Sequence, residues 1–453
     1  MALSAIFVIL YLFATTLVGA LAARGGPQGP GGPDPEGPDR RREYVLGGSK
    51  TGPLLLFATM AATNFSAFTV FGLSGAGYRL GWAYYPAMGF GTGLMAVSFL
   101  LLGVPLRRLA AERGYVSPAD FVRDRYESPA LAKAFSGVLV LVTLPYLATQ
   151  AIAGGRMLET LMGIPYPLAS FLLVAVTAFY TFRGGFKAVA WTDLLQLVVL
   201  FAGAGLAFAA VLGLAGGLPA AAARLSAVSP AHLARVGAGA GVDLGALLGL
   251  WLLWALADPL FPQLFQRFYT AKDDASLKRA AMLYPLVCGG LFFLTVGVGV
   301  VGAALLPGLV GKETEQVFSR LALAAGSPAA GAVFALAAVA ALMSTMDSQL
   351  LTLSSMIVED FLPKRLKARR LDSLFVALLA LAAWLISLAP PALILDWLTG
   401  AAFPAYAALA PVVWVGLYGR KTGAAAIAAS CALGLILVVL EATKLLSFGP
   451  LPA

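Results

Sequence analysis

The chain has 453 residues, of which 60% are hydrophobic and 12% charged, and its net charge is +9. This composition excludes an ordinary soluble domain, in which charged residues make up about a quarter of the chain. Apolar stretches of about 20 residues, each long enough to cross roughly 30 Å of hydrocarbon, recur from end to end. The sequence therefore predicts an all-α polytopic membrane protein, because a β-barrel would show alternating segments of about 10 residues.

About twelve spans are predicted, within one integral membrane domain that covers residues 1–453. We interpret the first span as a retained helix rather than a cleaved signal peptide, because no basic region precedes it. In chain order, the spans are 3–22, 52–77, 83–105, 130–155, 164–182, 189–213, 244–266, 280–306, 328–358, 372–390, 393–418 and 422–443.

The basic residues are distributed unevenly between the two sides of the predicted bundle. With the N-terminus outside, most of the 31 Lys and Arg fall in cytoplasmic loops, Arg267 among them. This is the positive-inside pattern, which predicts a plasma or inner membrane protein with both termini outside the cytoplasm. The positive charge thus reflects topology and a lipid bilayer partner, and no nucleic-acid partner is expected.

The sequence offers little for metal clusters or covalent catalysis. Cys288 and Cys431 both lie in apolar spans, and the single histidine, His232, falls in a predicted outer loop. No disulfide framework or zinc spacing is present. We find no nucleophile–base pair either, so an enzyme is not expected.

The strongest functional signal lies in residues 340–355, inside a long apolar segment. Its hydroxyl-bearing residues recur at steps of one, three, four and three, so they share one helical face, with Asp347 beside it. Oxygen ligands on a membrane helix suit a dehydrated monovalent cation, and an ionisable residue at that depth indicates a functional site. The alternative is a polar seam that holds helices together. The hydroxyls are those of Ser344, Thr345, Ser348, Thr352 and Ser355.

Two predicted spans are interrupted in their middles. The second has a polar centre at residues 63–66, where Asn and Ser compete with helical hydrogen bonds. The seventh contains Asp258, followed by Pro259 and Pro262, which remove backbone donors. The two spans are five apart and so cross the membrane in opposite directions. Matched interruptions in two inverted halves indicate a secondary-transporter binding site, although a single kink is common.

Four motifs make the chain similar to the sodium/solute symporter family, over residues 40–440, with the proline and pantothenate branch as the nearest match. They are Tyr44-Val-Leu-Gly-Gly48, Gly184-Gly-Phe-Lys-Ala-Val-Ala-Trp-Thr-Asp-Leu-Leu-Gln196, Pro262-Gln-Leu-Phe-Gln-Arg-Phe-Tyr-Thr-Ala271 and Ala341-Leu-Met-Ser-Thr345. The resemblance implies a LeuT-type five-plus-five inverted repeat. Its halves would be residues 52–213 and 244–418, with flanking helices at 1–22 and 422–443.

The resemblance also implies a main sodium site between the first interrupted span and span nine. Its ligands would be the carbonyls of Ala62, Phe65 and Ala341 and the hydroxyls of Ser344 and Thr345. Few formal charges suit an ion that must bind and then leave.

Some members of the family have a second sodium site, which would here involve Asp193, Ser344, Asp347 and Ser348. The two carboxylates supply charge that a second sodium ion, or a proton, would balance. Alternatively, Asp193 forms an ion pair with the nearby Lys187. Both interpretations stay open at this stage.

The substrate pocket implied by the resemblance lies between the two interrupted spans. Asn64 replaces the aspartate of proline symporters, which removes a negative charge near the sodium site.

Asp258 either binds a substrate ammonium or accepts backbone N–H groups freed by Pro259. No Lys or Arg is expected at this depth, so a substrate carboxylate would need helix N-termini. The pocket residues are Asn64, Ser66, Phe68, Tyr146, Trp254 and Asp258.

Together these patterns predict sodium-coupled symport of a small organic solute by alternating access. The solute would be an amino acid such as proline, or an organic acid. Two other functions remain as alternatives, namely proton-coupled symport through the membrane aspartates and a solute-sensing membrane module.

Overall fold

The computed structural model describes residues 2–24, 38–237, 242–389, 397–419 and 422–445. These residues form an all-helical bundle, in which the sole β-type pairing is an isolated bridge between Thr51 and Ala271. The prediction of an all-α membrane protein is confirmed for this part of the chain.

The first half of the chain contains eleven α-helices in the described residues. They are α1 (Ala2–Arg24), α2 (Pro38–Leu46), α3 (Pro53–Asn64), α4 (Leu73–Leu80), α5 (Tyr85–Gly89), α6 (Gly91–Ser98), α7 (Val104–Arg113), α8 (Pro118–Tyr126), α9 (Pro129–Met162), α10 (Tyr166–Ala215) and α11 (Leu218–Val228).

The second half continues with nine described α-helices. They are α12 (Leu244–Ala257), α13 (Pro262–Thr270), α14 (Asp274–Leu305), α15 (Val317–Ala324), α16 (Pro328–Met356), α17 (Arg369–Ser387), α19 (Phe403–Ala408), α20 (Ala410–Tyr418) and α21 (Ala424–Ala442). The span ends predicted at residues 390 and 393 lie outside the described residues.

Nine helical stretches in the described residues are long and apolar enough to cross a membrane, or ten with the bent pair Leu244–Leu260 and Pro262–Thr270. About twelve spans were expected from the sequence. The stretches Phe68–Arg113 and Tyr166–Ala215 have 46 and 50 residues, and at 1.5 Å per residue each is about twice the length of one crossing. Each therefore holds parts of two predicted spans.

Tyr166–Ala215 bends where the sequence has a glycine pair. Gly185 has φ 56° and ψ −148°, a backbone conformation that L side chains rarely adopt. A Cβ atom on Gly185 would also lie 2.3 Å from the carbonyl oxygen of Tyr44. Tyr44 in turn donates hydrogen bonds to the carbonyls of Thr181 (3.0 Å) and Phe182 (3.1 Å). The two glycine-containing motifs thus pack α2 against the bend.

Two interruptions lie where the sequence predicts them. After α3, Phe65 is extended (φ −85°, ψ 105°), and the chain resumes as the π-helix Phe68–Gly72. The second interruption follows the short helix Asp258–Leu260, and the axis turns by 57° before α13. The start of α3 and the end of α13 meet, because the Thr51 N–H donates to the carbonyl of Thr270 at 3.0 Å.

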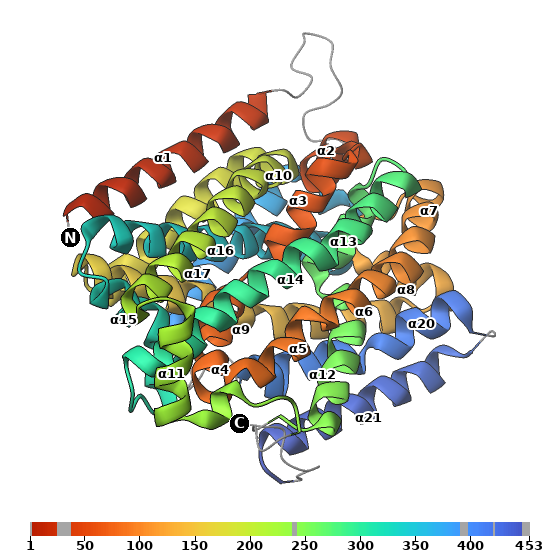
Figure 1. Cartoon of the computed structure of the whole chain (residues 1–453). Helices are drawn as coiled ribbons and strands as arrows, with labels where there is room; N and C mark the ends of the chain where they lie inside the picture. The colour runs from red at the N-terminus through yellow and green to blue at the C-terminus, as the bar shows by residue number, and fades with distance from the viewer. Residues whose placement is uncertain (1, 25–37, 238–241, 390–396, 420–421, 446–453) are drawn as a thin grey trace.

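Helix α16 occupies the centre of the bundle, and every residue from 337 to 356 is buried. It packs against α10, α9, α1, α17, α3 and α13. In Figure 1, α1 (red) runs along one edge of the molecule and α21 (blue) along the opposite edge. The polar stripe of α16 therefore faces protein rather than lipid.

Candidate functional site

The carbonyl groups released where α3 ends are capped by hydroxyls of α16. The Ser344 hydroxyl lies 2.9 Å from the carbonyl oxygen of Ala62 and 3.0 Å from that of Ala341. The Thr345 hydroxyl donates to the carbonyl of Phe65 at 2.9 Å. All five residues of the predicted main sodium site thus lie together, fully buried.

This cluster has the chemistry that a monovalent cation needs. Its five oxygens carry no formal charge, and they come from two separate elements, α3 with its extended end and α16. A hydroxyl oxygen keeps lone pairs when it stops donating to a carbonyl, so the same atoms suit either hydrogen bonding or ion coordination. Charge-poor oxygen rings of this kind bind ions and still release them.

The N–H groups released by the same break also find partners. The Ala67 N–H donates to Oε1 of Gln150 at 2.8 Å, and the Phe68 N–H donates to the Ser66 hydroxyl at 3.2 Å. Unwound backbone at membrane depth is tolerated where protein groups satisfy it. Gln150, on α9, was not predicted from the sequence, because a single polar residue in an apolar helix does not reveal its partner.

Asp193 lies beside a guanidinium rather than a lysine. Its carboxylate accepts a hydrogen bond from Thr59, and its Oδ2 lies 3.9 Å from Nη2 of Arg267. Lys187, the alternative partner of Asp193, instead pairs with Glu43. The interpretation of Asp193 as a partner of Lys187 is therefore wrong.

Arg267 was expected in a cytoplasmic loop and is instead fully buried in α13. Its guanidinium donates to the hydroxyls of Thr59 (2.9 Å) and Ser348 (2.6 Å), and it lies 4.9 Å from the ring centre of Phe186. Arg267 does not line the space between the two interruptions, where the sequence predicts no Lys or Arg. The bend at Pro262 brings α13 back into the bundle, which a hydropathy pattern does not show.

Asp347 joins the same buried group from α16. Its Oδ2 accepts hydrogen bonds from Tyr180 (2.6 Å) and Thr192 (3.4 Å). The other oxygens, Oδ1 of Asp347 and Oδ1 of Asp193, are buried and have no hydrogen-bond partner among the described residues. The guanidinium of Arg267 thus pairs with Asp193, donates to Ser348 and attracts the carboxylate of Asp347 electrostatically.

Five of the six predicted pocket residues, all but Ser66, line one small space together with other aromatic side chains. The Phe68 ring centre is 5.6 Å from that of Trp254 and 5.5 Å from that of Phe403. Tyr146 packs against Phe403 (5.6 Å), and its hydroxyl donates to Ser66 at 3.1 Å. Ser66 thus contacts the pocket through Tyr146 rather than lining it. The other lining residues were not predicted, and they are Thr69, Met88, Met95, Phe261, Phe292 and Phe403.

Asp258 and Asn64 connect the two interruptions directly. Nδ2 of Asn64 donates to Oδ2 of Asp258 at 2.9 Å and also contacts the hydroxyl of Tyr284. Both Asp258 and Tyr284 are buried. The hydrogen bond therefore ties the end of α3 to the end of α12.

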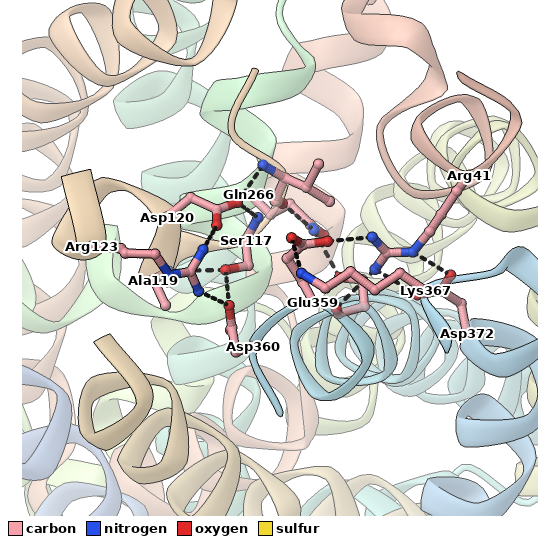
Figure 2. A network of polar contacts seen from close by, with 12 residues as sticks. Arg41, Ser117, Ala119, Asp120, Arg123, Gln266, Glu359, Asp360, Lys367 and Asp372 are labelled. Carbon is pink, nitrogen blue, oxygen red and sulfur yellow. Dashed lines mark hydrogen bonds and ion pairs between the residues drawn. The ribbon is translucent and has the colours of Figure 1, made fainter. Parts of the chain in front are cut away.

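An ionic cluster surrounds the C-terminal end of α16, where the chain continues as the π-helix Ile357–Phe361. Figure 2 shows its two parts. Glu359 pairs with Arg41 and Lys367, and Arg41 also pairs with Asp372 at 2.8 Å. Burial alone would lower the pKa of the Arg41 guanidinium, but Asp372 and Glu359 raise it above its usual value.

The second part of the ionic cluster centres on Asp360. Its carboxylate accepts hydrogen bonds from the hydroxyls of Ser117 (2.7 Å) and Ser136 (2.6 Å), and Arg123 lies 3.3 Å away. Arg123 also pairs with Asp120 at 2.6 Å. The ionic cluster thus joins α2, α8, α9 and α17 to the end of α16.

Among the described residues, no group of three or more His, Cys, Asp and Glu side chains has an arrangement that could hold a metal ion. The polar centre of the bundle is instead built from hydroxyls, carbonyls, two aspartates and one arginine. This donor set matches a monovalent cation better than a transition metal.

Comparison with known proteins identifies the pattern. The model of the sodium:solute symporter family matches residues 44–434. The sodium/pantothenate symporter of Escherichia coli (strain K12) is 30% identical over 433 residues, which cover 90% of this chain and 86% of that protein. The osmoregulated proline transporter OpuE of Bacillus subtilis (strain 168) is 29% identical over 400 residues, covering 84% and 79%.

Solved structures agree on the fold. A sodium-coupled sialic acid symporter in a substrate-bound, outward-open state has a TM-score of 0.76 at 17% identity, covering 98% of both chains. MhsT in complex with L-phenylalanine has a TM-score of 0.59 at 14% identity, covering 87% of this chain and 99% of that one. At these identities, the likeness shows the LeuT-type fold alone.

Proposed function

The chain belongs to the sodium:solute symporter family, and we propose where its sodium binds. Members of this family are membrane transporters and not enzymes, so the chain is a multi-pass sodium-coupled solute symporter. The main site consists of the carbonyls of Ala62, Phe65 and Ala341 and the hydroxyls of Ser344 and Thr345. The observation that carries this proposal is the contact of both hydroxyls with carbonyls at the unwound end of α3.

Sodium at this site links α16 to the first interruption, which also borders the pocket through Asn64 and Phe68. Ion binding thereby favours the state that accepts solute, and closure carries both ligands to the other side. The membrane potential contributes about 2.3 kcal/mol per charge per 100 mV, and a tenfold sodium gradient about 1.4 kcal/mol. One ion thus supports a solute gradient of roughly several hundred-fold.

We propose that Asp193, Asp347 and Ser348 hold a second cation, either sodium or a proton. Two carboxylates beside one guanidinium leave one negative charge, and one oxygen of each carboxylate is buried without a hydrogen-bond partner in the described chain. An uncompensated buried charge is costly, so a bound cation would stabilise the group. If that cation is a proton, the symporter couples to both gradients.

The solute binds between the interruptions, next to Asn64, Phe68, Tyr146, Trp254 and Asp258. We propose a small organic solute, such as an amino acid like proline, or an organic acid, as the relatives transport proline or pantothenate. Both termini lie outside the cytoplasm in this proposal. The basic loop residues support that orientation, which puts the ionic cluster of α16 on the cytoplasmic side.

Sodium binding can be tested without knowledge of the solute. Thermal unfolding of the purified protein is followed in sodium chloride and in potassium chloride at equal ionic strength. We expect saturable stabilisation by sodium, with at least a tenfold loss of apparent affinity in Ser344→Ala and in Thr345→Ala.

Ser354→Ala is the matched control, since the Ser354 hydroxyl donates at 2.8 Å to Leu351 of its own helix. Its sodium response should equal that of the unchanged protein. Equal effects of sodium and potassium on the unchanged protein, or an unaltered sodium response in Ser344→Ala and Thr345→Ala, would refute the proposed site.

A further inference from the structure

We propose that the transported solute is an ammonium compound, whose cationic nitrogen lies against Asp258 among the aromatic rings of the pocket. This inference rests on sodium-coupled symport and narrows its solute. Ammonium here includes primary to quaternary nitrogen, with or without a carboxylate on the same molecule. It excludes anions that lack a cationic nitrogen.

The charge of the pocket comes from one side chain. Of the eleven residues that line the space in the described chain, Asp258 is the one with a carboxylate, and none is Lys, Arg or His. The hydrogen bond that Asp258 accepts comes from a neutral amide, that of Asn64. No Lys or Arg of the described residues forms an ion pair with Asp258. The carboxylate is therefore free to pair with a charge on the solute.

The buried Arg267 does not change the charge of the pocket. Its guanidinium contacts Thr59, Ser348 and Asp193, which belong to the polar group around the second cation and do not line the pocket. A solute with a carboxylate and no ammonium would meet a buried like charge and no fixed cation. Like charges brought together away from water cost several kcal/mol, on the order of a thousandfold in affinity.

The walls around Asp258 are aromatic. Phe403 contacts four rings, with ring centres 5.5 Å from Phe68, 5.3 Å from Trp254, 5.6 Å from Tyr146 and 5.2 Å from Phe261. Aromatic faces attract cations, and boxes of such rings are a recurring way to bind quaternary and methylated ammonium groups. Aromatic walls next to one carboxylate therefore favour an organic cation over a polyhydroxylated solute.

Trp254 adds a polar contact to the pocket. The indole Nε1 of Trp254 is buried and has no hydrogen-bond partner among the described residues, so it can donate to one oxygen of the solute. Trp254 and Asp258 are four residues apart, one helical turn. The side chains pack closely and leave a free cavity of about 10 Å³ between them, roughly the space of one water molecule. They must therefore move apart to admit the solute, which offers an ammonium to Asp258 and an acceptor to Trp254.

Binding is tested with a set of probes that contains one pair differing in charge alone. Thermal stabilisation of the purified protein is measured in sodium chloride with tetramethylammonium, choline, glycine betaine, L-proline and pantothenate. The uncharged analogue 3,3-dimethyl-1-butanol, in which carbon replaces the nitrogen of choline, isolates the effect of the cation. In the parallel sodium-free series, potassium chloride replaces sodium chloride. An organic salt is not used for this replacement, because its cation would itself compete for the pocket. We expect at least one ammonium probe to bind, more tightly in sodium, and at least tenfold more tightly than the uncharged analogue.

Asp258→Asn should weaken binding of the ammonium probe at least a hundredfold. The same variant should keep its stabilisation by sodium alone, since Asp258 lies outside the main sodium site, and this response shows that it is folded. Glu112→Gln removes an exposed carboxylate on α7 and is the charge-matched control, with unchanged binding expected.

Two results would overturn the inference. One is that pantothenate, but no ammonium probe, stabilises the protein. The other is that the ammonium probe binds Asp258→Asn as well as the unchanged protein. In both cases an intact sodium response would leave the symport function standing, whereas failure of sodium to stabilise the unchanged protein would contradict the sodium site itself.

Discussion

Helix α16 and its π-helical extension contain two polar regions with different construction. In the middle, Ser344 and Thr345 contact backbone carbonyls through neutral hydrogen bonds. At the end, Glu359 and Asp360 join other helices through ion pairs and charged hydrogen bonds (Figure 2). Both regions connect α16 to neighbouring elements, but Ser344 and Thr345 do so without formal charge.

The difference in charge sets how each region responds to change. A neutral hydrogen bond contributes about 0.5–1.5 kcal/mol, so ion binding can replace a few of them at small cost. Removing one partner of a buried ion pair costs about 3–5 kcal/mol, because the other charge is left without compensation. The middle is thus suited to repeated binding and release, and the end to holding helices in place. The polar group of Asp193, Asp347 and Arg267 combines both properties, since it is charged and lies at the middle.

The largest effect is expected for Arg267→Ala. The change leaves Asp193 buried beside Asp347 with no guanidinium, so we expect a loss of about 3–5 kcal/mol in stability. Thermal unfolding in detergent measures it. Arg267→Lys should recover part of the loss, because it keeps the charge but not the planar fork that contacts Thr59 and Ser348.

A double variant separates charge from packing at this position. In Asp193→Asn with Arg267→Gln, neither partner is left ionised next to the other, and we expect higher stability than in Arg267→Ala alone. If the double variant and Arg267→Ala unfold at the same temperature, the unpaired charge of Asp193 does not cause the loss of stability. The charged group of Asp193, Asp347 and Arg267 would then not differ from the neutral contacts of Ser344 and Thr345 in its response to change.

A smaller loss, about 2–3 kcal/mol, is expected for Arg41→Ala. Glu359 is 14% exposed and keeps its pair with Lys367, so its charge stays partly compensated, whereas Asp372 is 0% exposed and loses its cation. Arg113→Ala is the matched control, since its partner Asp124 is 35% exposed and Arg113 is 56% exposed. An exposed pair contributes about 0–1 kcal/mol. Equal losses for the two variants in thermal unfolding would show that the ionic cluster does not hold the helices together.

The sequence predicts the parts of this architecture that follow from local chemistry. The hydroxyl spacing of residues 344–355 places them on one helical face, and Asp258 with two prolines breaks the seventh span. Asn64 and Ser66 similarly predict the first interruption. Such signals need no knowledge of the neighbours, because a proline or an intramembrane carboxylate acts on its own backbone or its own solvation.

The sequence does not predict contacts that depend on how segments return to the centre. Arg267 reads as a loop residue next to Lys272, yet the bend before α13 buries it. Gln150 and Phe403 do not stand out in the sequence, because their roles depend on Ala67 and on the pocket rings, which other segments supply. The ionic cluster likewise joins residues separated by more than 200 positions, such as Arg41 and Glu359.

The smallest loss of stability is expected for Thr352→Val. Thr352 lies between the two polar regions of α16. The Thr352 hydroxyl donates to Oε1 of Gln266 at 2.8 Å, and Nε2 of Gln266 donates to Ser355 at 2.9 Å. Valine has nearly the same shape, and Gln266 keeps its other contact, so we expect a loss of about 1 kcal/mol in thermal unfolding. The apparent sodium affinity should stay within twofold, because this neutral bond joins α16 to α13 outside the main site. A tenfold change in sodium affinity would instead place Thr352 on the path of the ion, and the neutral region of α16 would extend toward the ionic cluster.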